Sequence, residues 1–427
     1  MVTVAEPLCV RRPLLRPLCL RAKIARMIVE RVLDSVPVRV VYPDGTVRFG
    51  IDEPGAPKLE IVRPAALFDR VGDNPKIGLG EAYMAGDWRA AAGTDLADLL
   101  TPFAARLANL VPAWLTRLRV VVDKRIPRSQ RNTVDGARKN ISSHYDLSNE
   151  LFAQFLDPSM TYSSAWFDAA APFAGQSLEN AQHGKIGRIL DLANVAEGSR
   201  VLEIGTGWGT LAIEAARRGA HVTSVTISKE QYDLASERVA EAGLADEVDL
   251  RLQDYRHVRG TFDSIVSVEM IEAVGEAYWP TYFATLDRLL APNGTIGLQA
   301  ILMDDDRMLA TRKSYGWIQK YIFPGGLIPS LDAIQRAMSD HTGLGLVGRP
   351  LRFGEHYAET LRRWRRRFMD NWPQICDLGL DSTARRAWEF YLAYCEAGFR
   401  SGYLDVAQLQ LAHRNDDRPE PGRHEWA

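Results

Sequence analysis

"VLEIGTGWGT" (residues 201–210) decides the fold, because a short apolar strand runs directly into three glycines at alternate positions. Gly205 permits a tight turn after the strand, and Gly207 lets the backbone approach a ligand closely. Gly209 allows the following helix to pack against the strand. A turn of this kind, between a parallel strand and a helix, predicts a nucleotide-binding site.

Strands and helices alternate on both sides of this turn, the pattern of a parallel sheet covered on both faces. The predicted strands are 200–204, 221–227, 248–252, 262–268 and 294–301, and the predicted helices are 209–218, 229–242 and 278–290. The fold class is therefore α/β, with a Rossmann-like doubly wound domain.

The glycine spacing bears on which nucleotide is bound. It reads GxGxG after an acidic residue, Glu203, whereas the dinucleotide fingerprint is GxGxxG. The E-x-G-x-G-x-G form resembles motif I of class I S-adenosylmethionine (SAM) methyltransferases, in which the acidic residue answers the cationic amino end of the methionine moiety. A dinucleotide site and a purely structural glycine turn remain open alternatives at this point.

Polar residues follow the next two strands. Thr226 and Gln231 come after the second strand, and Asp254 and Tyr255 after the third. They are placed to bind ribose hydroxyls and an adenine edge. Taken singly, Thr226 is explained by strand propensity and Asp254 by a helix cap; together at neighbouring strand ends they favour SAM.

The chain of 427 residues is long enough for two or three domains. A hairpin around Pro43-Asp44-Gly45 and an amphipathic helix near 95–107 predict a small N-terminal α+β domain over 1–122. The highly charged stretch 123–140 is the expected linker, and 141–427 the methyltransferase domain.

The composition indicates which kinds of partner and which cellular compartment to expect. A formal net charge of -2 gives no general attraction to nucleic acid. The four cysteines (Cys9, Cys19, Cys376 and Cys395) show no CxxC spacing, so we expect a reducing cytoplasm and no metal site. No apolar run is long enough to span a bilayer. The basic, leucine-rich segment 11–33 is either a lipid-surface helix or an ordinary amphipathic one.

Seven motifs, in order along nearly the whole chain, resemble the cyclopropane-fatty-acyl-phospholipid synthase and mycolic acid cyclopropane synthase family. They are "HYDLSNELFAQFLDPSMTYSSAWF", "VLEIGTGWGT", "VTISKEQ", "SVEMIEAVG", "QKYIFPGG", "HYAETLRRW" and "YLAYCEAGFRSGYLDV". The segments "SVEMIEAVG", "GLQAI" and "TRKSYGWIQKYIFPGG" are most similar to the subgroup that makes tuberculostearic (10-methyl-branched) acid.

The resemblance implies a helical lid over the SAM pocket, formed by the aromatic segment 144–167. Tyr162 and Ser163 match SAM contacts, and Phe152, Phe155, Trp166 and Phe167 are expected to wall the pocket and an acyl tunnel. The resemblance also assigns SAM binding to the glycine turn itself, through Glu203, Gly205, Thr206, Gly207 and Gly209.

The resemblance further implies catalytic residues. Glu272 and Tyr357 match the family's active-site glutamate and tyrosine, which help to hold a bicarbonate base together with a cysteine, a histidine and the backbone amide at Ile301. Here Ser164 stands at the cysteine position and Gln299 at the histidine position, which puts bicarbonate in question. Cys395 matches a cysteine proposed as catalytic, but we rank it below Glu272 because alkene attack needs no thiolate.

Sequence analysis therefore predicts a SAM-dependent C-methyltransferase that acts on the double bond of oleoyl chains in phospholipids. The expected product is a 10-methylene or 10-methyl-branched chain, completed by a separate reductase. A cyclopropane product, a nucleotide-dependent oxidoreductase and a noncatalytic lipid-binding protein are the alternatives. We expect a cytoplasmic protein, peripheral to the membrane through 11–33 and the arginine-rich segment 361–372, and a homodimer.

Overall fold

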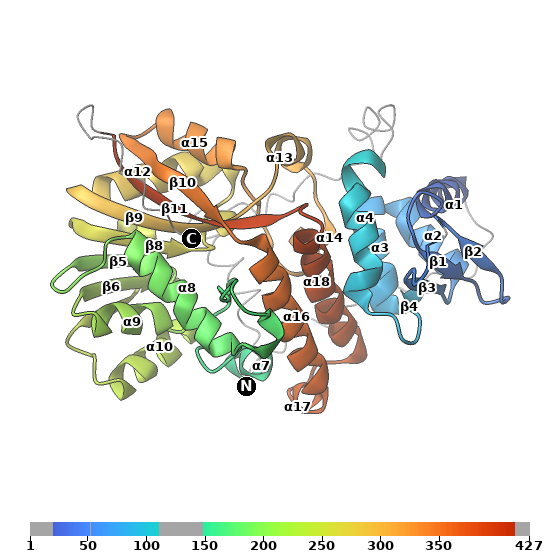
Figure 1. Ribbon diagram of the computed structural model, residues 1–427, viewed down its shortest axis with the longest axis horizontal. Coiled ribbons are helices and arrows are strands. Elements are labelled where there is room, and N and C mark those ends of the chain that lie inside the picture. Colours follow the sequence, from blue (N-terminus) through green and yellow to red (C-terminus); the bar gives the residue numbers. More distant parts are fainter. Residues whose placement is uncertain (1–19, 52, 111–147, 415–427) are drawn as a thin grey trace.

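The structure is a computed structural model that describes residues 20–51, 53–110 and 148–414. Two sheets stand at opposite ends of the molecule, with a pair of long helices between them (Figure 1). The predicted linker 123–140 lies outside the described residues. The expected domain boundaries therefore stay predictions.

The N-terminal unit has a four-stranded sheet in the order β2-β1-β3-β4. The predicted hairpin is confirmed, because Val41 and Val47 pair in antiparallel register around the turn. Its strands are β1 (Arg39–Val41), β2 (Val47–Phe49), β3 (Lys58–Ile61) and β4 (Trp88–Ala90), and its helices are α1 (Leu20–Leu33), α2 (Pro64–Asp73), α3 (Pro75–Ala85) and α4 (Leu96–Leu110).

The larger sheet has seven strands in the order β10-β11-β9-β8-β5-β6-β7. All five predicted strands are present as β5 (Arg200–Ile204), β6 (His221–Thr226), β7 (Val248–Leu252), β8 (Phe262–Val268) and β9 (Leu290–Leu302). These five pair in parallel. Two strands that the sequence analysis did not predict, β10 (Leu344–Arg352) and β11 (Asp405–His413), extend the sheet beyond β9 in antiparallel register.

Helices cover both faces of this sheet, as predicted. One face packs against α8 (Leu178–Leu192), α9 (Thr210–Arg217) and α10 (Lys229–Glu241), and the other against α12 (Trp279–Leu289) and α15 (Leu331–Ser339). Successive residues of β5 serve opposite faces: Val201 joins the first core and Leu202 the second. The carboxyl ends of β5 to β8 are thereby left open to a ligand.

Two long helices, α16 (Gly354–Asp370) and α18 (Ser382–Arg400), lie between the large sheet and the N-terminal unit (Figure 1). A single hydrophobic core runs from α1 and the small sheet through both helices to α7 (Asn149–Phe155). The other α-helices in the described residues are α11 (Ile271–Val274), α13 (Asp305–Thr311), α14 (Trp317–Tyr321) and α17 (Trp372–Asp377). The N-terminal unit is thus packed onto the helices that carry part of the site.

Candidate active site

The glycine turn after β5 has the geometry that its sequence predicts. All three glycines have positive φ, at 98°, 52° and 88° for Gly205, Gly207 and Gly209. A Cβ on Gly207 would meet nothing within 4 Å, so its backbone borders open space. A Cβ on Gly209 would lie 3.2 Å from Cβ of Ala235 in α10. At Gly209 the turn therefore lies closely against α10, while the following helix α9 contacts β5 and β6 as predicted.

A cavity lies beside this turn and gathers residues from six segments of the chain. Ten of the eleven predicted cofactor residues line it, Gly209 being the exception. They are Tyr162, Ser163, Glu203, Gly205, Thr206, Gly207, Thr226, Gln231, Asp254 and Tyr255. The residues that sequence reasoning assigned to one ligand thus meet around one space.

Glu203 brings a buried carboxylate to this cavity. Its Oε2 accepts a hydrogen bond of 2.5 Å from Ser224 Oγ, which lies 2.7 Å from Thr206 Oγ1. Burial raises the pKa of Glu203 to about 8. Burial also lowers the pKa of Lys185 to about 8, and Lys185 Nζ donates to Ser163 Oγ over 2.6 Å. A cationic ligand here would stabilise the ionised form of Glu203.

The polar residues after β6 and β7 are partly engaged with their neighbours. Thr226 Oγ1 donates to Gln231 Oε1 over 3.1 Å. Asp254 pairs with Arg256 at 2.6 Å and also accepts a bond from the Arg256 backbone amide at 3.0 Å. The helix-cap interpretation of Asp254 therefore holds beside the ligand-binding one, since the same residue caps a turn and lines the cavity.

The aromatic segment forms a lid only in part. Met160 to Ser163, which follow α7, line the cavity, and the Tyr162 hydroxyl lies 2.8 Å from that of Tyr391. Four of its rings do not line this cavity, contrary to prediction: Phe152, Phe155, Trp166 and Phe167. The three phenylalanines are fully buried. They pack in the core behind the lid, because ring-to-ring contacts with Trp208, Trp364 and Phe173 satisfy them there.

A second polar cluster adjoins the cavity and is centred on Glu269, which sequence reasoning missed. Glu269 Oε1 accepts bonds of 2.9 Å from the Ser164 backbone amide and from Gln299 Nε2. Its Oε2 accepts a bond of 2.7 Å from the Tyr357 hydroxyl. Three predicted catalytic residues therefore converge on one internal carboxylate. Ser164 contributes its backbone amide, and not the hydroxyl that was expected.

Glu272 lies beside this cluster but does not line the cavity. Its Oε1 accepts a bond of 2.5 Å from the backbone amide of Ile301, which the resemblance had assigned to bicarbonate. Its Oε2 is buried and accepts no hydrogen bond from the described residues. Burial, followed by the charge of Glu269, raises the pKa of Glu272 to about 8. Glu272 is thus mostly protonated at neutral pH.

Bicarbonate does not fit this arrangement. The donors expected to hold it are already used: Gln299 and Tyr357 donate to Glu269, and the Ile301 amide donates to Glu272. The Ser164 hydroxyl donates to the carbonyl of Ala165. A further anion would face two carboxyl groups without a free donor among these four. The replacements at Ser164 and Gln299, which put bicarbonate binding in question, thus go together with an internal carboxylate at Glu269.

The structure also supports the low rank given to Cys395. Burial raises the pKa of its thiol to about 12, so that it is uncharged at neutral pH. It lies among the apolar residues packed against the main core. Its catalytic role stays a prediction without support from its surroundings.

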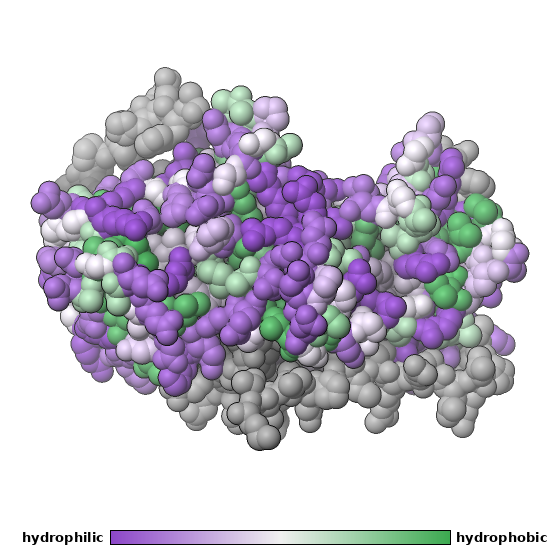
Figure 2. All heavy atoms as spheres, turned by 90° about the horizontal axis from the view of Figure 1, so that it is seen from below, coloured by the Kyte–Doolittle hydropathy of each residue, from purple (hydrophilic) through white to green (hydrophobic). Residues whose placement is uncertain are grey.

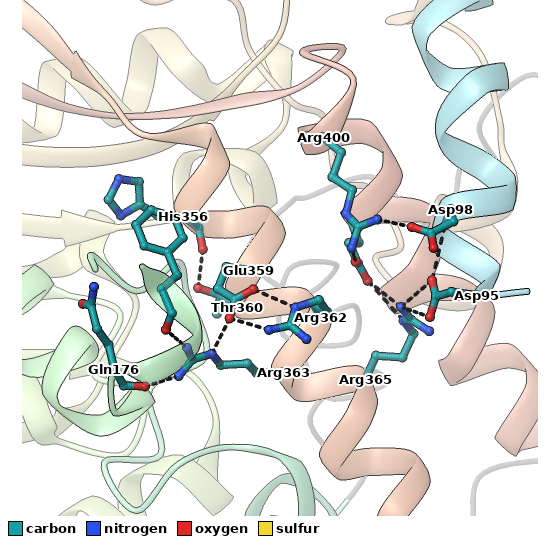
Figure 3. Close-up of polar contacts among 12 residues, drawn as sticks. Asp95, Asp98, Gln176, His356, Glu359, Thr360, Arg362, Arg363, Arg365 and Arg400 are labelled. Atoms are coloured by element: carbon teal, nitrogen blue, oxygen red, sulfur yellow. Dashed lines mark hydrogen bonds and ion pairs between the residues drawn. The ribbon is translucent and has the colours of Figure 1, made fainter. Parts of the chain in front are cut away.

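The arginine-rich segment 361–372 is largely internal, contrary to the prediction of a headgroup interface. Trp364 and Phe368 are fully buried, and Arg363 and Arg365 nearly so. Figure 3 shows Arg365 and Arg400 facing Asp95 and Asp98 at the start of α4, while Glu359 pairs with Arg362 and Arg363. Arg365 holds α16 to Glu396 of α18 and to Asp95 at the start of α4, so charge spacing alone misjudged the segment.

Glu269 and Lys185 are the main residues of the site that sequence reasoning did not select. A usable signal existed for Glu269, since two acidic residues three positions apart follow a strand in "SVEMIEAVG". The sequence offered no comparable signal for Lys185, because a lysine in a helical segment such as "HGKIGRIL" is ordinarily exposed to solvent.

Fold and cavity together define a class I SAM-dependent methyltransferase. The glycine turn borders open space, and the buried carboxylate of Glu203 lines the cavity, where it can pair with a cationic ligand. The family model for mycolic acid cyclopropane synthetase matches residues 132–409. The chain belongs to this family.

Individual relatives extend the comparison beyond the domain. The chain is 52% identical over 393 residues, 91% of each chain, to tuberculostearic acid methyltransferase UfaA1 of Mycobacterium tuberculosis. It is 36% identical to the cyclopropane-fatty-acyl-phospholipid synthase of Escherichia coli, over 85% of this chain and 90% of that one. The crystal structure of mycolic acid cyclopropane synthase CmaA1 with SAH and CTAB superposes with a TM-score of 0.58 at 30% identity, covering 64% of this chain and 97% of that one.

Proposed function

We propose that the protein transfers the methyl group of SAM to the double bond of an oleoyl chain in a phospholipid. The product would be a 10-methylene chain that a separate reductase saturates to the tuberculostearic-type 10-methyl branch. The observation that carries this proposal is the 52% identity to a tuberculostearic acid methyltransferase over 91% of both chains. The paired carboxylates beside the cavity support it, since methylation of an alkene leaves a cation and a proton to be removed.

The chain's own residues divide the work. Bound SAM supplies an electrophilic methyl group on a positively charged sulfur. Glu203 pairs with the cationic amino end of SAM, and Gly207 lets SAM approach the backbone closely. The lid residues Met160 to Ser163 exclude water from the cavity. This exclusion is needed because an alkene is a poor nucleophile and would otherwise compete with water for the methyl group.

The test is incubation of the purified protein with SAM and oleoyl phospholipid vesicles, followed by gas chromatography and mass spectrometry of the acyl chains. Proton NMR separates the products, because an exocyclic methylene has vinyl protons and a cyclopropane has strongly shielded ones. Exclusive cyclopropane formation would refute the product assignment. No methyl transfer at all would favour the noncatalytic lipid-binding alternative.

We further propose that α1 is the element that lies on the lipid surface. Leu20, Ile24 and Met27 follow one another at helical spacing and are 74%, 45% and 62% exposed. Lys23 and Arg31 are exposed beside them, while the opposite face buries Ala22, Ala25 and Leu33. An exposed apolar stripe flanked by basic residues suits an anionic membrane surface.

Other surfaces give this role less support. Figure 2 shows a face that is mostly hydrophilic, with small hydrophobic areas and no broad apolar one. Within the described ranges, no helix has the length and apolarity required to traverse a bilayer. The cytoplasmic location and the homodimer expected from the sequence stay predictions.

Vesicle sedimentation tests the role of α1. Replacing Leu20, Ile24 and Met27 with serine should release the protein from anionic vesicles while SAM affinity stays unchanged. Replacing Arg366, which is exposed on α16, with glutamine is the matched control and should change little. Unaltered sedimentation of the serine variant would exclude α1.

A further inference from the structure

Glu269 occupies an unusual backbone position at the carboxyl end of β8. Its φ is 52°, in the left-handed region that residues with side chains rarely adopt, and its backbone amide donates to Gln299 O at 2.8 Å. Such strain is found where the surrounding structure holds a residue in place for a purpose. Here the conformation directs the side chain to the border of the SAM cavity, which Glu269 lines and Glu272 does not.

The donors around Glu269 come from three separate parts of the chain. Ser164 lies in the lid segment, Gln299 in β9 and Tyr357 in α16. Gln299 is itself fixed, since its Oε1 accepts a bond of 3.1 Å from Gln408 Nε2 of β11. Both Gln299 and Gln408 are fully buried. The carboxylate is therefore held in one orientation by elements that meet only in the folded protein.

The neighbouring carboxyl groups of Glu269 and Glu272 have different hydrogen-bonding environments, which favour different charge states. Burial raises the pKa of Glu269, and three hydrogen bonds and the positive charge of Lys185 oppose that rise. Glu272 has one donor and an unpaired buried oxygen. Two coupled acids share their protons unequally, and the one with more donors keeps the negative charge. The hydrogen-bond geometry thus favours Glu269 over Glu272 as the member of the pair that carries the negative charge.

We propose that Glu269 is the catalytic base of the methylation, a covalently attached carboxylate in the place where bicarbonate would otherwise be held. This inference rests on the proposed function. The alkene π pair forms a bond to the transferred methyl carbon while the sulfur–methyl bond pair returns to sulfur, leaving a cation on the chain. A hydride shifts from the methylated carbon to its neighbour. A C–H pair of the new methyl then forms the exocyclic double bond, and its proton passes to Glu269, which becomes a neutral acid.

The experiment compares wild type with Glu269→Gly and Glu269→Gln, using SAM and oleoyl phospholipid vesicles, with formation of S-adenosylhomocysteine as the readout. Glycine suits the positive φ and empties the space between the three donors. We expect at least about a hundredfold loss of turnover in both variants, as for removal of a general base, with SAM affinity by calorimetry changed less than about threefold. Millimolar formate, acetate or bicarbonate should restore turnover in Glu269→Gly but not in Glu269→Gln, whose amide still fills the space.

Asn194→Gly is the matched control, because Asn194 has φ 55°, is exposed and lies away from the cavity. It should keep wild-type turnover. The assignment is overturned if either Glu269 variant turns over within tenfold of wild type, if no anion rescues a glycine variant that binds SAM, or if bicarbonate stimulates the wild type. Absence of methyl transfer by the wild type would instead refute the proposed function, so the two failures are distinct.

Discussion

Replacing Glu203 with glutamine should stabilise the ligand-free protein and weaken SAM binding at once. Glu203 has an ordinary pKa of 4.5 in the unfolded chain and about 8 in the folded one. At pH 7 the folded protein must therefore keep a proton that the unfolded chain releases. At about 1.4 kcal/mol per pKa unit, over roughly two and a half units, this costs about 3 kcal/mol of stability.

Glutamine has no such cost and can still accept the hydrogen bond from Ser224. We expect the free energy of unfolding at pH 7 to rise by about 1 to 3 kcal/mol. The sign follows from the raised pKa: the wild type is most stable below pH 4.5 with respect to this group and loses that stability as pH rises toward 8. The variant should lack this part of the pH dependence. Urea denaturation at a series of pH values measures it.

Ligand binding should change in the opposite direction. Ionised Glu203 answers a cation, so the SAM affinity of the wild type should rise with pH by up to about tenfold per unit until pH 8. The variant should bind at least about tenfold more weakly and without this slope. Glu237→Gln, on an exposed position of α10, is the control. Equal stability and equal SAM affinity in Glu203→Gln and wild type would refute the reasoning.

Three further variants test other parts of the site. Gly207→Val should abolish SAM binding by calorimetry, because a branched side chain would strain a positive φ and enter the ligand space; unchanged affinity would contradict this. Cys395→Ser should keep turnover within about threefold, because the thiol is not ionised, and a hundredfold loss would restore its catalytic rank. Arg365→Gln should lower the free energy of unfolding in urea by about 3 kcal/mol, since Glu396 loses a buried partner. The exposed Arg366→Gln should not.

The cofactor half of the site was predictable from sequence because it is built from local signals. Most of its residues sit at or just after a strand end that the apolar pattern reveals, and parallel strands bring their carboxyl ends together. Tyr162 and Ser163, in the lid segment, were supplied by the resemblance. Glu203, Thr226 and Asp254 therefore had to meet once β5, β6 and β7 were correctly placed.

The base half was less predictable because its geometry depends on distant segments. The resemblance supplied Tyr357 and Gln299, but which carboxylate they face depends on the backbone conformation at Glu269. Similarly, β10 and β11 follow several helices and join the sheet in antiparallel register, so strand alternation gave no guide to them. The arginines of α16 were misjudged because their acidic partners lie up to 270 residues away in the chain.

A tethered base also accounts for the product. A cyclopropane forms if the methyl proton is removed while the positive charge is still on the adjacent carbon, whereas a methylene forms if a hydride shift comes first. Three hydrogen bonds oppose the rise that burial causes in the pKa of Glu269, so Glu269 is a weaker base than a buried carboxylate without them, which delays proton removal and gives the shift time. In Glu269→Gly the rescuing anion takes over this step, so the fraction of cyclopropane should increase in the order formate, acetate, bicarbonate, as basicity increases. Mass spectrometry and NMR of the acyl chains measure that fraction. A product ratio that is the same for all three anions would show that the strength of the base does not choose between the two outcomes.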